Sequence, residues 1–413
     1  MNKLELLAPA GDLEKLKIAI VYGADAVYFG GQNFSLRAGA GGLSIEEMKE
    51  GLEFAHSRGK KCYLTLNIYA HNEDIAPLYS YLEEIKDLSI DGILVSDPGI
   101  MLMVKEIMPN VEIHLSTQAN LTNSKTASFW ANMGMKRLVL ARELSLDEIK
   151  GIRKELPDDV ELEAFVHGAM CISYSGRCLL SNFMTGRDSN RGACAHPCRY
   201  KYVLQEEKRP GEYYPIEEDD RGTYIMNSKD LCMIEHIPDL VAAGVSSAKI
   251  EGRMKSIYYI AAVVGAYRKA IDSYYDNPDG WEFDPEWLTE LEKASHREFT
   301  TGFYYEYPED AQNYKSSSYI KNYSFTGIVL DYIEDEKMAV VQQRNKMVIG
   351  DKVEFFGPDG NCFSQTISVL KDYETGKDIE EAPHPKQKLL IGVSQAVSEN
   401  YMIRKRLEEV EEE

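Results

Sequence analysis

"LELLAPAGDLEKLKIAIVYGADAVYFGG" (Leu4–Gly31) holds the signals of a strand, a helix and a second strand. Apolar, strand-like runs lie at its two ends, Leu4–Ala8 and Ala26–Phe29. Between them, apolar residues recur with a helical period over Asp12–Gly23, and Asp12 is a residue type that caps helices. This order predicts two parallel strands joined by a right-handed helical crossover.

The same unit recurs through the first 250 residues. Six further runs rich in apolar and β-branched residues follow, at Lys61–Asn67, Gly92–Ser96, Val111–Ser116, Lys136–Leu140, Val160–Val166 and Ser247–Ile250. Helix-period stretches separate most of them, at Ser44–Arg58, Ile75–Leu88, Gly99–Met108 and Ser145–Glu155. Eight such units predict a (β/α)8 TIM-like barrel over residues 1–255. An open doubly wound sheet is the alternative, but the first turn, "APAGD", lacks the GxGxxG spacing of a dinucleotide site.

Two further regions follow the predicted barrel. The stretch "IYYIAAVVGAYRKAIDSYY" (257–275) has one apolar helical face, so we expect a helical segment over 256–320 to pack on the barrel. From about residue 321, short strands separated by Gly, Asp and Pro turns predict a small all-β barrel that reaches an acidic tail at 413. Its basic turn "RNKMVIGDK" (344–352) is either a solvated hairpin or a contact for an RNA backbone.

Charge and apolar patterning restrict the class of protein. A formal net charge of -21 argues against general affinity for nucleic acid, so any RNA contact must be local. The N-terminal residues form no secretory apolar region, and no apolar run approaches the length that spans a membrane. We therefore expect a cytoplasmic protein without membrane contact. In that compartment clustered cysteines are metal ligands or redox groups more often than disulfides.

The stretch "HGAMCISYSGRCLLSNFMTGRDSNRGACAHPCRYK" (167–201) follows the seventh predicted strand. It opens an insertion over about 167–230 that should emerge at the active-site face, before a helix predicted over "DLCMIEHIPDLVAAG" (230–244). It contains five arginines and lysines, a single acid, and the cysteines Cys171, Cys178, Cys194 and Cys198. Four thiolates in one loop suit a four-iron, four-sulfur cluster or a tetrahedral zinc ion. Zinc remains the alternative, although no CxxC pair occurs here.

Polar residues at the predicted strand ends form a candidate site, because TIM-barrel active sites gather where the strands end. Each of them could instead be a cap or an ordinary ion pair. The candidate catalytic residues are His167, Gln118, Glu143 and Glu251. The candidate substrate-binding residues are Arg37, Asn67, Arg142 and Arg253 at strand ends, and Arg177, Arg187 and Arg191 in the insertion. Guanidinium groups bind carboxylates through paired hydrogen bonds, so Arg37, Arg142 and Arg253 are predicted to hold a small dianion.

A peptidase is the competing interpretation of the same residues. His167 lies four residues before Cys171, which permits a Cys–His nucleophilic pair. Metal binding through that thiolate would remove the nucleophile, so the two interpretations exclude each other. The HExxH and GxSxG signatures of other peptidases and hydrolases do not occur in the sequence.

Several motifs resemble one known family. The stretch "EAFVHGAMCISYSGRCLLS" (Glu163–Ser181) resembles the signature of the collagenase-like peptidase family, and "ELLAPAG", "GADAVYFGG", "STQAN", "NSKDL" and "KIEGRMKS" match the same family. Nearly the whole chain is covered, including the predicted C-terminal β-barrel. The family takes its name from an unclassified peptidase group. Its bacterial members include oxygen-independent, prephenate-dependent hydroxylases that carry a [4Fe-4S] cluster.

The resemblance implies a function more specific than composition can. For a chain with a C-terminal barrel it implies hydroxylation of a tRNA wobble uridine to 5-hydroxyuridine. The expected partners are the tRNA anticodon loop and prephenate, and the implied cluster ligands are Cys171, Cys178, Cys194 and Cys198. The alternatives are hydroxylation of a ribosomal RNA cytidine or a ubiquinone precursor, peptide hydrolysis, and RNA binding without catalysis.

Overall fold

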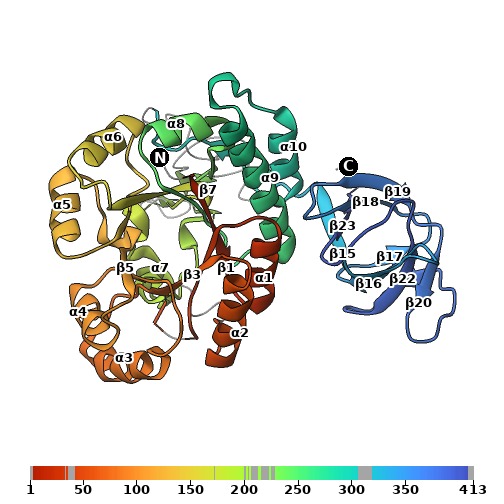
Figure 1. The fold of residues 1–413 in the computed structure, drawn as a ribbon, viewed down its shortest axis with the longest axis horizontal. Coiled ribbons are helices and arrows are strands. Elements are labelled where there is room, and N and C mark those ends of the chain that lie inside the picture. Colours follow the sequence, from red (N-terminus) through yellow and green to blue (C-terminus); the bar gives the residue numbers. More distant parts are fainter. Residues whose placement is uncertain are drawn as a thin grey trace.

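The computed structural model describes residues 3–32, 34–35, 42–171, 173–199, 201–202, 204–205, 213–214, 223–224, 228–305 and 319–407. Figure 1 shows a ring of helices around a set of strands, with a separate antiparallel sheet beside it. Among the described residues, no helix is both long enough and apolar enough to cross a membrane.

Eight parallel strands close into a barrel, as predicted. In chain order they are β1 (Glu5–Ala10), β2 (Ala26–Phe29), β3 (Lys61–Leu66), β4 (Gly92–Val95), β5 (Glu112–Leu115), β6 (Arg137–Val139), β7 (Glu161–Ala169) and β13 (Ser247–Ile250). Strand β13 pairs with both β7 and β1, which closes the ring and excludes the open doubly wound sheet. We call the end where these strands finish the mouth, and the end where they begin the base.

Helices cover the outside of the barrel (Figure 1). They are α1 (Leu13–Val21), α2 (Ile45–His56), α3 (Asn72–Ile85), α4 (Pro98–Ile107), α5 (Ser124–Asn132), α6 (Leu146–Lys154) and α8 (Ile237–Ala242). Side-chain caps fix where several of them begin: Asp12 accepts from the N–H of Lys15, and Ser44 and Ser145 each form a capping box. These helices start just after a strand ends, so their N-termini lie toward the mouth.

Strand β7 continues beyond the barrel and recruits two more strands. Its last residues pair antiparallel with β12 (Asp230–Cys232), which in turn pairs parallel with β14 (Phe299–Thr300). The helix expected over residues 230–244 is therefore wrong at its start. Only a 3-10 turn at Ile234–His236 and α8 are helical, because the free edge of β7 offers backbone partners to β12.

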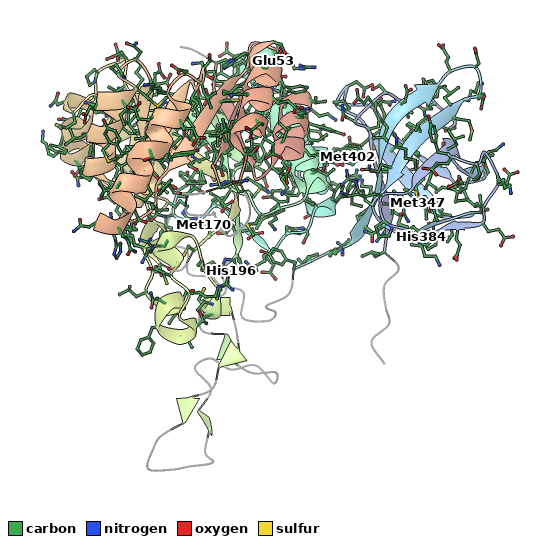
Figure 2. All side chains as sticks on the ribbon, turned by 90° about the horizontal axis from the view of Figure 1, so that it is seen from below. Glu53, Met170, His196, Met347, His384 and Met402 are labelled. Atoms are coloured by element: carbon green, nitrogen blue, oxygen red, sulfur yellow. The ribbon has the colours of Figure 1, made fainter. Side chains whose placement is uncertain are left out.

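The cysteine insertion leaves the mouth directly after β7. Its described elements are η3 (Tyr174–Gly176), α7 (Leu180–Thr185), η4 (Ser189–Arg191), η5 (Pro197–Arg199), β8 (Lys201–Tyr202), β9 (Leu204–Gln205), β10 (Tyr213–Tyr214) and β11 (Thr223–Tyr224). Strand β8 pairs with β11 and β9 with β10. In Figure 2, turned by 90°, the insertion stands off one end of the barrel.

The rest of the chain forms a helical layer and a curved sheet. Helix α9 (Ile257–Asp276) packs on α1 and β1 and is joined through η7 (Pro278–Gly280) to α10 (Pro285–Lys293). A seven-stranded antiparallel sheet then curves into a half-barrel, in the order β19-β18-β23-β15-β16-β22-β20. Its strands are β15 (Tyr323–Ile333), β16 (Met338–Gln343), β18 (Lys352–Phe356), β19 (Cys362–Thr366), β20 (Leu370–Asp372), β22 (Lys388–Gly392) and β23 (Met402–Arg406), with a separate pair β17 (Met347–Val348) and β21 (Glu381–Ala382). The acidic tail predicted after residue 407 lies outside the described residues.

The half-barrel is attached to the helical layer through polar contacts. The side chain of Arg404 in β23 is fully buried and pairs with Glu290 of α10 and Glu354 of β18. The hydroxyl of Tyr22, at the end of α1, donates to the carbonyls of Phe356 and Asn400 at 3.2 and 2.9 Å. These contacts hold the sheet against the side of the barrel, away from the mouth.

Candidate active site

A cavity of about 100 Å³ opens at the mouth, where the predicted site was expected. Its lining is drawn from β2, β3, β4, β6, β7 and β13 and from the loops that follow β3, β5, β6 and β13. The polar and aromatic residues that line it are Tyr28, Thr65, Asn67, Ser116, Thr117, Gln118, Arg142, Phe165, Lys249, Glu251 and Arg253. The lining thus carries three cations and one carboxylate, a formal excess of positive charge that favours an anionic ligand.

Arg253 is held in a buried position by hydroxyl groups. Its Nη1 donates to Thr65 Oγ1 at 3.2 Å and its Nη2 to Ser35 Oγ at 3.3 Å. Gly30, after β2, makes this placement possible, because a Cβ there would lie 2.4 Å from Arg253 Nη2. The two hydroxyl groups thereby orient the guanidinium.

Lys249 is a cavity residue that sequence reasoning missed. It sits within the buried strand β13, and its Nζ lies 2.5 Å from Glu163 Oε1 and 4.2 Å from the centre of the Tyr28 ring. Burial lowers the pKa of Lys249, and the charge of Glu163 opposes that shift. Its sequence signal was a lysine between apolar neighbours in a strand expected to be buried.

Glu163 connects the mouth to a charged network at the base of the barrel. Arg137, at the start of β6, is 2% exposed and pairs with Glu5 at 2.6 Å, Glu161 at 2.6 Å and Glu163 at 3.3 Å. Burial tends to raise the pKa of Glu163, but Lys249 and Arg137 hold it below its usual value. Three carboxylates therefore surround the one guanidinium at the base.

Two amide side chains lie at the rim of the cavity. Asn67 Nδ2 donates to Ser116 Oγ at 3.2 Å. The backbone carbonyl of Gln118 accepts from Arg177 Nε at 2.9 Å and from the hydroxyl of Tyr69 at 3.3 Å. The Gln118 Oε1 atom is buried and has no hydrogen-bond partner among the described residues, so it is free to accept from a ligand.

Glu143 holds the insertion and does not line the cavity. Its carboxylate accepts from the backbone N–H of Ser175 at 2.6 Å and from the Ser175 hydroxyl at 2.8 Å. Ser175 has a φ of 44°, a conformation that non-glycine residues adopt rarely and that these two hydrogen bonds support. Its neighbour Arg142 does line the cavity, where its Nη1 donates to the carbonyl of Ala169 at 3.3 Å.

His167 faces away from the cavity, although Phe165 two residues earlier faces into it. A register shift where β7 pairs with β13 inserts one extra residue between Phe165 and His167, which reverses the expected alternation. The ring packs against Tyr259, Tyr267 and Phe299, and its buried Nδ1 has no hydrogen-bond partner in the described part of the chain. Burial lowers the pKa of His167 to about 3. The structure therefore places a neutral histidine in the packing layer, outside the cavity.

The four cysteines of the insertion have intermediate exposure. The N–H of Leu180 points to Cys178 Sγ at 3.3 Å, and the N–H of His196 points to Cys194 Sγ at 3.4 Å. Such N–H···S contacts favour thiolates, the form that binds metals, so the donor set fits a metal or cluster chemically. No three Cys, His, Asp or Glu side chains in the described part of the chain already surround a metal-sized space. Binding would have to draw the sulfurs together.

Hydrogen bonds tie the cysteine loop into one unit. Ser189 Oγ and Asn190 Nδ2 donate to the carbonyl of Cys178 at 2.5 and 3.0 Å. The hydroxyl oxygen of Ser181, in α7, accepts from the N–H of Ala195 at 2.9 Å, and η5 packs against α7. The segments that carry Cys178, Cys194 and Cys198 are thereby held beside one another.

Of the other four arginines of the predicted site, the three that the structure describes are not among the residues that line the cavity. Arg177 and Arg187 are exposed on the insertion. Arg191 instead pairs with both carboxylate oxygens of Asp74 in α3, at 2.7 and 2.9 Å, and anchors the insertion to the barrel. Arg37 lies outside the described residues.

The basic turn of the half-barrel has its charges partly compensated. Arg344 pairs with Glu14 of α1, and Lys346 pairs with Glu381 at 2.5 Å. These contacts favour a structural hairpin over an RNA contact.

Comparison with known proteins identifies the same two parts of the chain. Peptidase family U32 matches residues 11–314, and the Peptidase family U32 C-terminal domain matches residues 321–404. The chain is 46% identical to tRNA hydroxylation protein P1 of Bacillus subtilis, over 98% of this chain and 95% of that protein. It is 38% identical to tRNA hydroxylation protein P of Escherichia coli, over 98% and 97%. A protein of Porphyromonas gingivalis called collagenase is 32% identical, over 90% and 91%.

Proposed function

The chain belongs to Peptidase family U32, and on that premise we propose that it is a cytoplasmic tRNA-modifying enzyme. The proposed reaction is hydroxylation of the wobble uridine at C5 to give 5-hydroxyuridine, with prephenate as co-substrate. The two relatives named for tRNA hydroxylation, each matched over nearly its full length, support this reaction class.

The observation that carries the proposal is a cation-rich cavity at the mouth, from which a four-cysteine insertion emerges. Prephenate is a dicarboxylate, and a dicarboxylate needs cationic partners to offset the loss of water when it is buried. Arg142 and Arg253 provide two such partners, and Lys249 adds a third cation to the lining although it also pairs with Glu163. We assign Arg253 to one carboxylate, because its neighbours already orient its two terminal nitrogens toward the cavity side of β3.

We assign the metal centre to Cys171, Cys178, Cys194 and Cys198. A [4Fe-4S] cluster held there would supply one-electron redox chemistry. The chain's own contribution is to stabilise the thiolates through the N–H groups of Leu180 and His196. Glu143 fixes the start of the loop through Ser175, which makes it a positioning residue. Zinc remains the alternative occupant of the same four thiols.

A single-stranded RNA substrate is compatible with a cavity at the mouth of the barrel. An anticodon loop is single-stranded, so its uridine can enter a cavity without the disruption of a duplex. Gln118 Oε1 is an unused acceptor inside the cavity and can receive the N3–H of a uracil ring. Arg177 bonds to the backbone of the same residue and adds positive charge at the rim.

Peptide hydrolysis is disfavoured by the placement of the one histidine it would use. A Cys–His pair requires an imidazole beside the thiol. The ring of His167 instead packs among Tyr259, Tyr267 and Phe299, on the outer side of β7. Membership of a family named for peptidases therefore does not by itself assign peptidase chemistry to this chain.

Nucleoside analysis of tRNA tests the proposal. A strain that lacks this protein should lose wobble 5-hydroxyuridine and the nucleosides derived from it, and the intact gene should restore them. The Cys194→Ala variant should fail to restore them at equal protein level. Unchanged 5-hydroxyuridine in the deletion strain, in the absence of a second copy of the gene, would refute the proposed function.

A further inference from the structure

The cysteine insertion exposes a cluster of large apolar side chains. Leu179 and Phe183 are 75% and 89% exposed, and Tyr174 and Met184 are 51% and 44% exposed. All four fall within one short segment, 174–184, and we call them the α7 patch. Isolated exposed apolar residues are common on soluble proteins, but a local cluster indicates a binding surface.

The helix itself is not built to cover this patch. Of the six residues of α7, only Ser181 is buried, and its hydroxyl is used to hold the loop. Phe183 lies on the outward side of the helix and contributes nothing to the core of the insertion. The Phe183 ring is therefore exposed to water at a position where the fold itself does not require an apolar side chain.

Positive charge accompanies the patch in the sequence. Arg177 lies within the segment 174–184 and Arg187 follows it, and both are exposed. The stretch 167–201 holds five basic residues against the single acid Asp188, in a chain whose net charge is -21. Phosphate groups are thus attracted here and repelled by most of the remaining surface.

The patch is continuous with the candidate active site. In Figure 1 α7 lies within the ring of helices, and in Figure 2 the insertion stands off the end of the barrel, so α7 stands over the mouth. Arg177, which follows Tyr174 in the chain, bonds to the carbonyl of the cavity residue Gln118 at 2.9 Å. If one unit of a linear polymer enters the cavity, the units next to it in the polymer would contact the patch.

We infer that the α7 patch is a stacking platform for unpaired RNA bases next to the modified nucleotide, with Phe183 as its main contact. The inference rests on the proposed function and adds how the substrate is recognised. Base faces stack on aromatic rings without regard to sequence, while arginines nearby hold the phosphates. A duplex hides those faces, so the platform selects a single-stranded loop.

An uncharged stacking contact and a phosphate contact respond differently to salt. Loss of a stacked ring lowers affinity by the same factor at every salt concentration, because no counterion is involved. Loss of an arginine that neutralises a phosphate also makes the salt dependence shallower, by about 0.7 in logarithmic slope for single-stranded RNA. The two kinds of contact can therefore be separated in one titration series.

The test is fluorescence anisotropy of the full-length protein with an unmodified tRNA transcript, at several salt concentrations. Phe183→Ala should weaken binding by about 5- to 150-fold with an unchanged salt slope. Phe183→Trp should retain the affinity of the parent protein. Phe183→Leu, which keeps an apolar side chain but no ring face, should behave like Phe183→Ala.

A matched control comes from the outside of the barrel. Phe129 in α5 is 55% exposed, far in the chain from the insertion, and Phe129→Ala should leave tRNA binding unchanged. A blunt RNA duplex of equal length should bind more weakly than the tRNA, and Phe183→Ala should not weaken it further.

Three results would overturn the inference. Undiminished tRNA affinity of Phe183→Ala excludes a stacking role. Full affinity of Phe183→Leu indicates a generic apolar contact, and a dimer that dissociates only in Phe183→Ala indicates that a second copy of the chain covers the patch. If Phe183→Ala binds tRNA normally while wobble 5-hydroxyuridine still depends on the protein, the platform fails and the proposed function survives.

Discussion

The two ends of the barrel use the same kinds of side chain in opposite ways. At the base, the buried guanidinium of Arg137 contacts three carboxylates, those of Glu5, Glu161 and Glu163. At the mouth, Arg253 is oriented by the hydroxyls of Thr65 and Ser35, and three cations share the cavity lining with one carboxylate. Charge at the base is compensated within the fold, whereas the cavity lining at the mouth carries a formal excess of positive charge that favours an anionic ligand.

This difference separates structural from functional charge more clearly than residue type does. A buried guanidinium surrounded by carboxylates stabilises the fold only as part of the complete set, since removing one member leaves the others buried and repelling. A cavity lining with more cations than carboxylates instead attracts an anionic ligand. Substitutions at the base should therefore change stability, and substitutions at the mouth should change binding.

The largest expected effect is on stability, at the base. Arg137→Met should lower the free energy of unfolding by about 3–5 kcal/mol, because three carboxylates lose their shared partner. Chemical denaturation followed by circular dichroism measures it. Lys125→Ala, at an ion pair whose lysine is 86% exposed, is the control and should cost less than about 1 kcal/mol. Equal stability of the two variants would remove the distinction between the ends.

The next effect is on ligand binding, at the mouth. Arg253→Ala should weaken prephenate binding by roughly 1.5–3 kcal/mol, the value of a charged hydrogen-bonded contact. Isothermal titration calorimetry measures it, with Arg58→Ala on the outer surface of the barrel as the control. Prephenate binding at parental affinity in Arg253→Ala would show that another cation holds the carboxylate.

The pH dependence of stability tests the burial of His167, which lies at the mouth end of the barrel but outside the cavity. Its folded-state pKa of about 3 is below the usual value of 6.5 for histidine, so its contribution to stability is complete above pH 6.5 and is lost as the pH falls toward 3. At pH 5 the loss is about 2 kcal/mol. His167→Phe should lose about that much less stability between pH 7 and pH 5, as measured by denaturation at both pH values.

His384→Phe, at an exposed histidine, controls for the substitution and should keep the parental pH dependence. His167→Phe should also keep its tRNA hydroxylation, since the ring does not line the cavity. A hydroxylation defect in a folded, iron-replete His167→Phe protein would contradict this placement.

The smallest effect distinguishes two of the insertion arginines, Arg187 and Arg191. Arg191→Ala should cost about 0.5–1 kcal/mol of stability, through the loss of its partly exposed pair with Asp74, and should leave the salt slope of tRNA binding unchanged. Arg187→Ala should leave stability unchanged and make that slope shallower by about 0.7. Filter binding at several salt concentrations measures the two slopes, and chemical denaturation measures the two stabilities. A reversed pattern would exchange the two roles.

The barrel was predictable because its signals are local. Each of the eight strand runs lies where the sequence predicts it, and caps such as Asp12 and Ser44 start helices where expected. The secondary-structure prediction is wrong where a strand distant in the sequence determines the local structure. Residues 230–232 form a strand because the overrun of β7 is there to pair with, and no local pattern reveals that partner.

The candidate site was predictable in part, for the same reason. Asn67, Gln118, Arg142, Glu251 and Arg253 follow strand ends, and the barrel geometry brings them to one cavity. Alternation along a strand fails for His167, because one extra residue in β7 turns it outward. The pairing of Arg191 with Asp74 joins residues 117 positions apart, which spacing cannot reveal.

The central claim is that the mouth and the cysteine insertion form one hydroxylation site. The most direct measurement is hydroxylation of an unmodified tRNA by anaerobically purified protein, with prephenate added and oxygen excluded, followed by mass spectrometry of the nucleosides and iron analysis. The account predicts 5-hydroxyuridine and about four irons per chain, with both lost in Cys194→Ala, whereas Arg253→Ala loses only the product. Stoichiometric zinc without iron, or full activity of Cys194→Ala, would contradict it.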